Sequence, residues 1–177
     1  MYDGIRSPVT QTFGLGIFQP ATEADLDRLE AFFRDRGAPL LHEVSPLADK
    51  SLWPMLGARG YKPVEFTSVM FLPIGGRLPV APPRNESIRV RVIAEHEQEL
   101  WAQTAADGWR EVAEFSEALL DLTRVIAATA DSLHFLAELD GNAIATGALS
   151  IHNGVALFAG ASTIPEARKQ GAQLALL

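Results

Sequence analysis

The hydrophobic pattern of the first 72 residues predicts helices and strands in alternation. One helix is predicted between Thr22, which stands three residues before Asp25 as in a capping box, and Gly37, because apolar residues there recur every three or four positions. A second helix is predicted over 51–59, ending at Gly60. Short apolar runs predict strands over 12–17, 40–44 and 64–72.

The second half has a different order of elements. Alternating apolar and charged residues predict a strand over 88–92, two helices follow over 95–104 and 116–129, and three further strands are predicted over 134–139, 143–151 and 155–162. The turns Asp140-Gly141-Asn142 and Asn153-Gly154 indicate hairpins, so these three strands should form an antiparallel meander. The expected fold is α/β, with a mixed, mostly antiparallel sheet flanked by helices, in two half-domains, 1–72 and 87–177, joined by a Pro- and Gly-rich linker, 73–86.

Composition limits the function classes. The 177 residues are 47% hydrophobic and 21% charged, which is typical of a folded globular chain. A net charge of −7 argues against nucleic acid as a partner, since phosphate neutralisation needs clustered Lys and Arg. No signal peptide or membrane-length apolar run is present, so a cytoplasmic protein without a membrane partner is expected. Cysteine is absent and the four histidines lie far apart, so no metal site is predicted.

Candidate chemistry lies near the C-terminus, where the last strand is followed by Pro165 and by a loop, 168–173, that opens a helix. Successive backbone N–H groups at such a loop can bind an anion. Gly171 allows the backbone to approach a phosphate closely, and Arg168 and Lys169 add positive charge.

The segment 154–177 closely resembles the cofactor segment of GNAT acetyltransferases. That pattern is an apolar strand, a small residue or valine before a proline, then Arg or Gln, any two residues, Gly, any residue, and Gly or Ala. Thr163, Pro165, Arg168 and Gly171 match it, and Gln173 departs from it at the last position. The order of elements from 88 to 162 also resembles the front half of the GNAT fold. The resemblance implies acetyl-CoA as cofactor and acetyl donor. Its pantetheine arm would bind at Ala161, Ser162 and Thr163, and its pyrophosphate at the amides of Arg168, Lys169, Gln170, Gly171, Ala172 and Gln173.

The resemblance also implies the reaction, which is direct attack of a primary amine of a small molecule or peptide on the thioester. The connection between the two helices of this half would cover the acceptor pocket, which makes Trp109, Glu111 and Phe115 candidate substrate contacts. No catalytic acid or base is identified, because the strand 155–162 contains neither a carboxylate nor a histidine. The rival function is a non-catalytic acyl-CoA-binding or protein-interaction module.

Two explanations account for a GNAT back half that does not follow residue 177. In the first, the chain is a tandem GNAT protein with a degenerate N-terminal half and a truncated C-terminal acetyltransferase domain; the segment 56–61, Leu-Gly-Ala-Arg-Gly-Tyr, resembles the Leu-x-x-x-Gly-Phe ending of the family's last helix. In the second, the N-terminal half completes the C-terminal sheet, within one chain or by exchange in a homodimer. A structure in which 12–72 and 134–162 share no sheet contradicts the second explanation.

Overall fold

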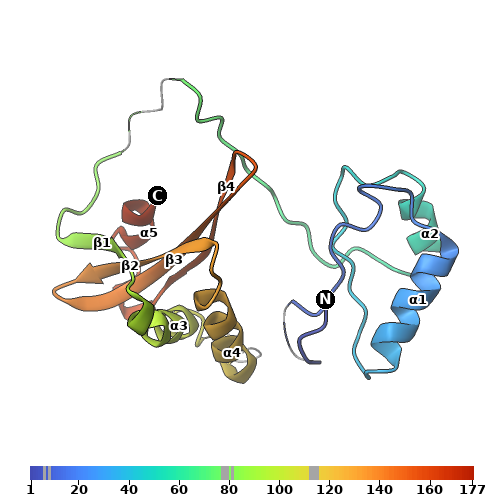
Figure 1. Cartoon of the computed structure of the whole chain (residues 1–177), viewed down its shortest axis with the longest axis horizontal. Coiled ribbons are helices and arrows are strands. Elements are labelled where there is room, and N and C mark those ends of the chain that lie inside the picture. Colours follow the sequence, from blue (N-terminus) through green and yellow to red (C-terminus); the bar gives the residue numbers. More distant parts are fainter. Residues whose placement is uncertain (6, 8, 77–79, 81, 112–115) are drawn as a thin grey trace. The chain divides into compact units, whose positions relative to one another are not determined.

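The computed structural model describes residues 1–5, 7, 9–76, 80, 82–111 and 116–177. It divides into two compact units, Met1–Val80 and Ala81–Leu177, which are described separately. Among the described residues, the regular elements of the first unit are helices, whereas the second unit holds a sheet with helices (Figure 1). The boundary between the units lies inside the stretch 73–86, and the identification of the units as GNAT-like half-domains stays a prediction.

The first unit is built on α1 (Glu23–Arg34) and α2 (Leu52–Ala58). The predicted capping box starts α1: the Asp25 amide donates to Thr22 Oγ1 over 3.2 Å, and the Thr22 amide donates to the Asp25 carboxylate over 2.9 Å. The two helices share a small core in which Leu26, Leu52 and Leu56 are buried.

The strands expected over 12–17, 40–44 and 64–72 are not formed in the described residues. Thr12 and His42 make an isolated parallel bridge, and 64–72 has no regular secondary structure. Its large apolar side chains are exposed, Phe66 by 87% and Phe71 by 88%. Apolar β-branched and aromatic runs fit a pleated surface, but a strand also needs a neighbour that supplies its hydrogen bonds, and local sequence does not specify that neighbour.

The second unit contains a four-stranded sheet of β1 (Ile88–Val92), β2 (Ser132–Leu139), β3 (Asn142–His152) and β4 (Val155–Thr163), in the order β1-β2-β3-β4, with every pair antiparallel. The predicted strand and meander are therefore confirmed, and Asp140-Gly141 and Asn153-Gly154 form left-handed hairpin turns. Within the described residues the sheet consists of these strands alone. Completion of the sheet by 12–72, within one chain or by exchange between two, stays a prediction.

Helices cover both faces of this sheet (Figure 1). A 3₁₀ turn, Glu95–Glu97, leads into α3 (Gln98–Asp107); α4 (Ser116–Ala127) follows, and α5 (Ala172–Leu176) follows a second 3₁₀ turn, Pro165–Ala167. Leu136 packs with Trp101 of α3 on one face, and the next residue, Ala137, packs with Ala172 and Ala175 of α5 on the other. Consecutive strand residues point to opposite faces, so β2 contributes to both cores.

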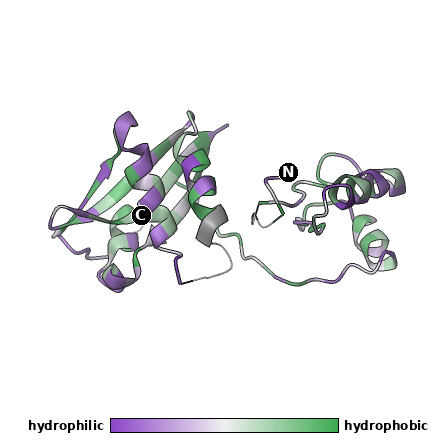
Figure 2. Cartoon of the chain, turned by 90° about the horizontal axis from the view of Figure 1, so that it is seen from below, coloured by the Kyte–Doolittle hydropathy of each residue, from purple (hydrophilic) through white to green (hydrophobic). Residues whose placement is uncertain are grey.

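The α5 face of the sheet has a core made largely of alanines, namely Ala137, Ala145, Ala167, Ala172 and Ala175, with Ile88 and Ile144. Hydrophobic and hydrophilic residues follow one another closely along the strands (Figure 2). This thin apolar layer places α5, and the loop before it, directly over the sheet.

A β-bulge distorts β4 near its C-terminal end. The pairing of β3 with β4 shifts so that Gly160 and Ala161 stand opposite Gly147 alone. Gly160 has a φ of +61°, and its carbonyl accepts a hydrogen bond from Thr146 Oγ1 over 3.0 Å. A Cβ on Gly160 would lie 3.3 Å from the buried Trp101 ring. Because a bulge bends its strand, β4 changes direction here, and Ser162 and Thr163 beyond the bulge still pair with Thr146 and Ala145.

Candidate functional site

A cavity of about 640 Å³ lies at this bent end of β4. It is lined by the segment after α3, by the end of β4 and by the loop that opens α5: Gly108, Trp109, Glu111, Ala161, Ser162, Thr163, Ala167, Arg168, Lys169, Gly171, Ala172, Gln173 and Leu174. All residues predicted to bind the cofactor line it except Gln170. The substrate candidates Trp109 and Glu111 also line it, and Phe115 lies outside the described residues. The volume is in the range of small-molecule sites.

The loop before α5 presents free backbone donors to this cavity. Lys169 and Gly171 have φ angles of +64° and +91°, and Gly171 is the residue at which α5 begins. Among the described residues, the amides at positions 169–174 donate to no acceptor. Asn85 Nδ2 holds the loop from outside by donating to the Gln170 carbonyl over 3.2 Å. Unpaired amides on a left-handed turn form the kind of concavity that binds anions.

The Arg168 guanidinium does not point freely into the cavity. Its Nη1 donates to Glu111 Oε2 over 2.6 Å, its Nη2 to the Gly108 carbonyl over 2.8 Å, and its Nε to the Thr163 carbonyl over 3.4 Å. The neighbouring Lys169 makes no ion pair with a described residue. Of the two cations that the sequence suggested for phosphate binding, Arg168 is therefore held by the protein, and Lys169 is less constrained.

Gln173 is the position at which the sequence departs from the family pattern. Its Nε2 donates to the Ser162 carbonyl and to Thr163 Oγ1, both over 2.9 Å. The side chain thus ties the first turn of α5 to the end of β4. It does not pair with the loop amides, so it leaves these donors available.

Gly108 lies between the two predicted helices of this half, and the sequence indicates no role for it. Its φ of −65° is ordinary for a helix end, so conformation does not require glycine there. Space does: a Cβ on Gly108 would lie 1.7 Å from Ser162 Oγ and 3.0 Å from the Thr163 amide nitrogen. Ser162 Oγ also donates to the Ala105 carbonyl over 2.8 Å. A glycine after a helix is a sequence signal for a helix end, but nothing in the sequence reveals this contact.

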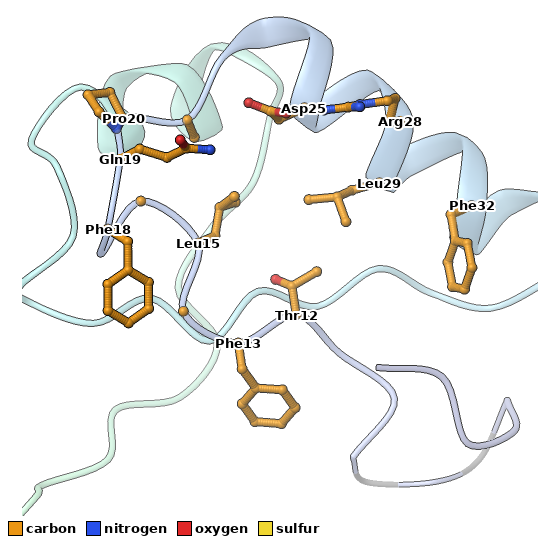
Figure 3. Close-up of a pocket in the computed structure, with 13 residues that line it drawn as sticks. Thr12, Phe13, Leu15, Phe18, Gln19, Pro20, Asp25, Arg28, Leu29 and Phe32 are labelled. Carbon is orange, nitrogen blue, oxygen red and sulfur yellow. Dashed lines mark hydrogen bonds and ion pairs between the residues drawn. The ribbon is translucent and has the colours of Figure 1, made fainter. Parts of the chain in front are cut away.

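The first unit contains a second cavity, of about 580 Å³, beside α1 (Figure 3). Phe13, Phe18 and Phe32 contribute aromatic surface to it. Here the N-terminus of α1 is occupied, because Asp25 accepts hydrogen bonds from Thr22 and Arg28 that lower its pKa to about 2. A carboxylate at the helix start repels a phosphate, so this cavity is not an equivalent anion site.

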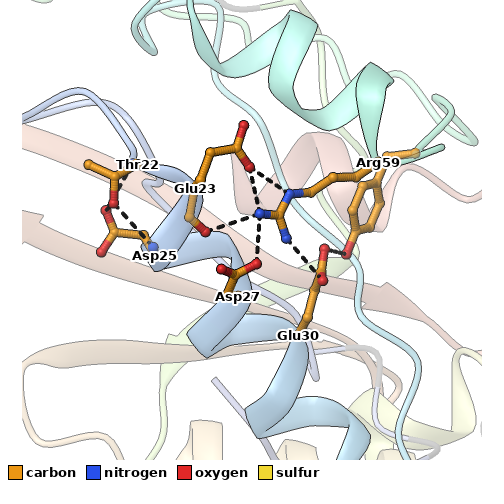
Figure 4. A network of polar contacts seen from close by, with 7 residues as sticks. Thr22, Glu23, Asp25, Asp27, Glu30 and Arg59 are labelled. Carbon is orange, nitrogen blue, oxygen red and sulfur yellow. Dashed lines mark hydrogen bonds and ion pairs between the residues drawn. The ribbon is translucent and has the colours of Figure 1, made fainter.

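Charged side chains on α1 serve a structural contact (Figure 4). Arg59, just after α2, forms ion pairs with Glu23 over 2.5 Å, Asp27 over 2.7 Å and Glu30 over 3.0 Å, and the Tyr61 hydroxyl also donates to Glu30. Hydrogen bonds to Glu23, Asp27 and Glu30 raise the pKa of the guanidinium. These carboxylates are therefore paired with a cation rather than gathered for a metal.

The described histidines do not form a site. His134 packs edge-on against Trp101, with ring centroids 5.1 Å apart, and burial lowers its pKa. Burial also lowers the pKa of His42, whose Nδ1 lies 2.8 Å from Thr12 Oγ1. Within the described part of the chain, no group of three or more His, Cys, Asp or Glu side chains could hold a metal, and no helix is long and apolar enough to cross a membrane.

No family model matches the chain, and no curated protein does. Among solved structures, a GCN5-related N-acetyltransferase from Kribbella flavida matches with a TM-score of 0.62 and 24% identity, over 84% of this chain and 54% of its own length. A predicted acetyltransferase from Clostridium acetobutylicum, solved with acetyl-CoA, matches with a TM-score of 0.36 and 14% identity, over 50% of this chain and 68% of its own. A GCN5-related N-acetyltransferase from Ralstonia eutropha JMP134 has a TM-score of 0.37 and 17% identity, over 50% of this chain and 70% of its own.

The chain therefore spans about half the length of the Kribbella flavida protein. That superposition includes most of this chain, and the second unit has the predicted succession of strand, two helices, three-stranded meander, loop and helix. The chain has the mixed α/β fold of the GCN5-related N-acetyltransferases, the GNAT superfamily.

Proposed function

We propose that this chain binds acetyl-CoA in the cavity beside β4 and belongs to an enzyme that transfers the acetyl group to a primary amine of a small molecule or peptide. The observation that carries the proposal is the row of amides at 169–174, which have no acceptor among the described residues and turn around the left-handed Gly171 at the cavity. This arrangement fits the pyrophosphate of coenzyme A, because backbone N–H groups bond most strongly to charged oxygens.

The rest of the cavity fits an elongated arm attached to that pyrophosphate. The end of β4, with Ala161, Ser162 and Thr163, forms the wall next to the loop, at and just beyond the bulge. When bound, acetyl-CoA supplies an acetyl thioester. The loop amides would hold its anionic end, and the end of β4 would line the arm.

Trp109 and Glu111 suit an amine acceptor. An aromatic face attracts an ammonium group, and a carboxylate does so where its charge is not fully engaged. Both side chains line the cavity, with the Glu111 carboxylate shared with Arg168. An amine with a pKa near 10.4 must lose a proton before it attacks. β4, with the sequence VALFAGAST, contains no side chain that could accept that proton. This absence favours a second candidate function, an acyl-CoA-binding module without catalysis.

Two measurements test the proposal in sequence. Isothermal titration of acetyl-CoA, CoA and dephospho-CoA should give micromolar binding for each if the loop amides hold the pyrophosphate; no binding at millimolar ligand would contradict the site. Release of free thiol from acetyl-CoA over a panel of primary amines then separates the two functions. Binding with acceptor-dependent release identifies the enzyme, and binding without release identifies the module.

A further inference from the structure

Arg168 occupies the position at which sequence reasoning expects a phosphate-binding cation, yet its guanidinium lies against the protein. We propose that Arg168 is a positioning residue: it holds the acceptor-side segment from Gly108 to Glu111 against the end of β4, while Lys169 provides the charge for the phosphates. The inference rests on the proposed function for the identity of the ligand, and on geometry for the role of Arg168.

Hydrogen bonds to the protein hold the Arg168 guanidinium on all sides of its planar fork. Each of its three guanidinium nitrogens contacts a protein oxygen, on Glu111, Gly108 and Thr163 respectively. These acceptors come from three places in the chain, namely the segment beyond α3, the end of α3 and the end of β4. A phosphate that pairs with this guanidinium would compete with Glu111, whose carboxylate lies 2.6 Å from Nη1.

The contact also completes the C-terminus of α3. Helix ends leave carbonyls without partners, and a cation there is favoured by the helix dipole. Ser162 Oγ binds the Ala105 carbonyl, and Arg168 binds the Gly108 carbonyl. Trp109 and Glu111 follow directly, so Arg168 fixes the chain from which both candidate acceptor contacts project.

The exposure of the ion pair indicates that it acts on position more than on global stability. The Arg168 and Glu111 side chains are 44% and 60% exposed, and exposed ion pairs contribute little to folding. Lysine cannot replace arginine here, since a single ammonium does not reproduce a planar fork that reaches three acceptors. By contrast, Lys169 sits at a positive φ inside the row of free amides and makes no ion pair with a described residue.

Adjacent substitutions that remove the same charge separate the two roles. Lys169→Gln should weaken CoA binding roughly fivefold, the effect of losing one phosphate contact. Arg168→Gln should raise the Kd for CoA by less than about twofold. For the acceptor, Arg168→Gln and Arg168→Lys should both raise KM, since the segment that carries Trp109 and Glu111 is no longer held.

A second readout needs no ligand. In a Trp53→Phe background, Trp109, which is 49% exposed, is the exposed tryptophan, because Trp101 is fully buried. Arg168→Gln and Glu111→Gln should each increase acrylamide quenching of Trp109. The double variant should increase it no further than Arg168→Gln alone, since the Glu111 contact is one of those lost with Arg168. Thermal unfolding of each variant shows that the fold is retained.

The positioning role is overturned if Arg168→Gln weakens CoA binding as much as Lys169→Gln while quenching of Trp109 stays at the parent level. Absence of CoA binding by the unmodified protein would instead contradict the proposed function. In that case the quenching cycle still decides the role of Arg168, so the two failures are distinguishable.

Discussion

Replacing Gly171 by alanine gives the sharpest test of the anion loop. Gly171 has a φ of +91° and a ψ of +14°, and an added Cβ would meet Asn85 Cβ at 3.8 Å, an ordinary contact. Steric clash is therefore absent, and the cost is that of holding an L-residue in the left-handed region, about 1–2 kcal/mol. The whole effect comes from backbone conformation.

The measured effect of this cost depends on the conformation that the loop adopts in the variant without ligand. If the loop keeps its shape, the unfolding free energy falls by about 1–2 kcal/mol. If the loop relaxes to a right-handed turn, the amides at 169–174 lose their common direction. The ligand must then restore it, which raises the Kd for CoA by about 5- to 30-fold.

Gly141→Ala is the matched control. Gly141 has a φ of +80°, nothing lies within 4 Å of its added Cβ, and it sits in the turn between β2 and β3. Gly141→Ala should lower the unfolding temperature and leave CoA affinity unchanged. If Gly171→Ala keeps the unfolding temperature of the unmodified protein, its loop has relaxed, and titration calorimetry should then show weaker CoA binding for this variant alone. Unchanged CoA affinity together with an unchanged unfolding temperature in Gly171→Ala would refute the claim that the loop amides carry the site.

Three further substitutions test the packing and the charges. Gly108→Ala should destabilise the protein by about 1–3 kcal/mol in denaturant unfolding, because its Cβ would overlap Ser162 Oγ, and Ser162→Gly should recover part of that loss. Arg59→Gln should lower the urea midpoint of the first unit at low salt, and a loss that persists unchanged in 1 M salt argues against an ionic cause. Burial lowers the pKa of His134, so stability is full above the unfolded pKa near 6.5 and falls as pH drops below it. His134→Gln should flatten this pH dependence, and an unchanged slope would exclude His134 as its source.

Much of the second unit is predictable because its signals are local. Alternation over 88–92 indicates a strand, and the Asp-Gly and Asn-Gly turns define hairpins in which each strand pairs with the next one along the chain. The strand β1 pairs with β2 across two intervening helices, and alternation alone does not indicate that partner. In the first unit, an equally apolar run over 64–72 forms no strand, since nothing nearby in the sequence supplies a neighbour. Strand pairing is therefore predictable here where a tight turn provides the partner.

In the candidate site, too, features that depend on local sequence were predictable and contacts between distant segments were not. A glycine before an apolar run at the end of a strand indicated the loop, and Gly171 indeed adopts a left-handed conformation. The direction of the Arg168 side chain, the bond from Gln173 to Ser162 and the close approach of Gly108 depend on contacts between segments 11 to 60 residues apart. Composition and spacing do not encode such contacts.

The alanine layer under α5 sets the height of the loop above the sheet. Because Ala137, Ala145 and Ala172 each interpose a single methyl group, the separation between helix and sheet is near its minimum. A larger residue at any of these positions would push α5, and with it the loop that opens α5, away from the sheet. The position of the proposed anion loop thus depends on side chains that face the sheet rather than the cavity, and these positions tolerate little increase in size.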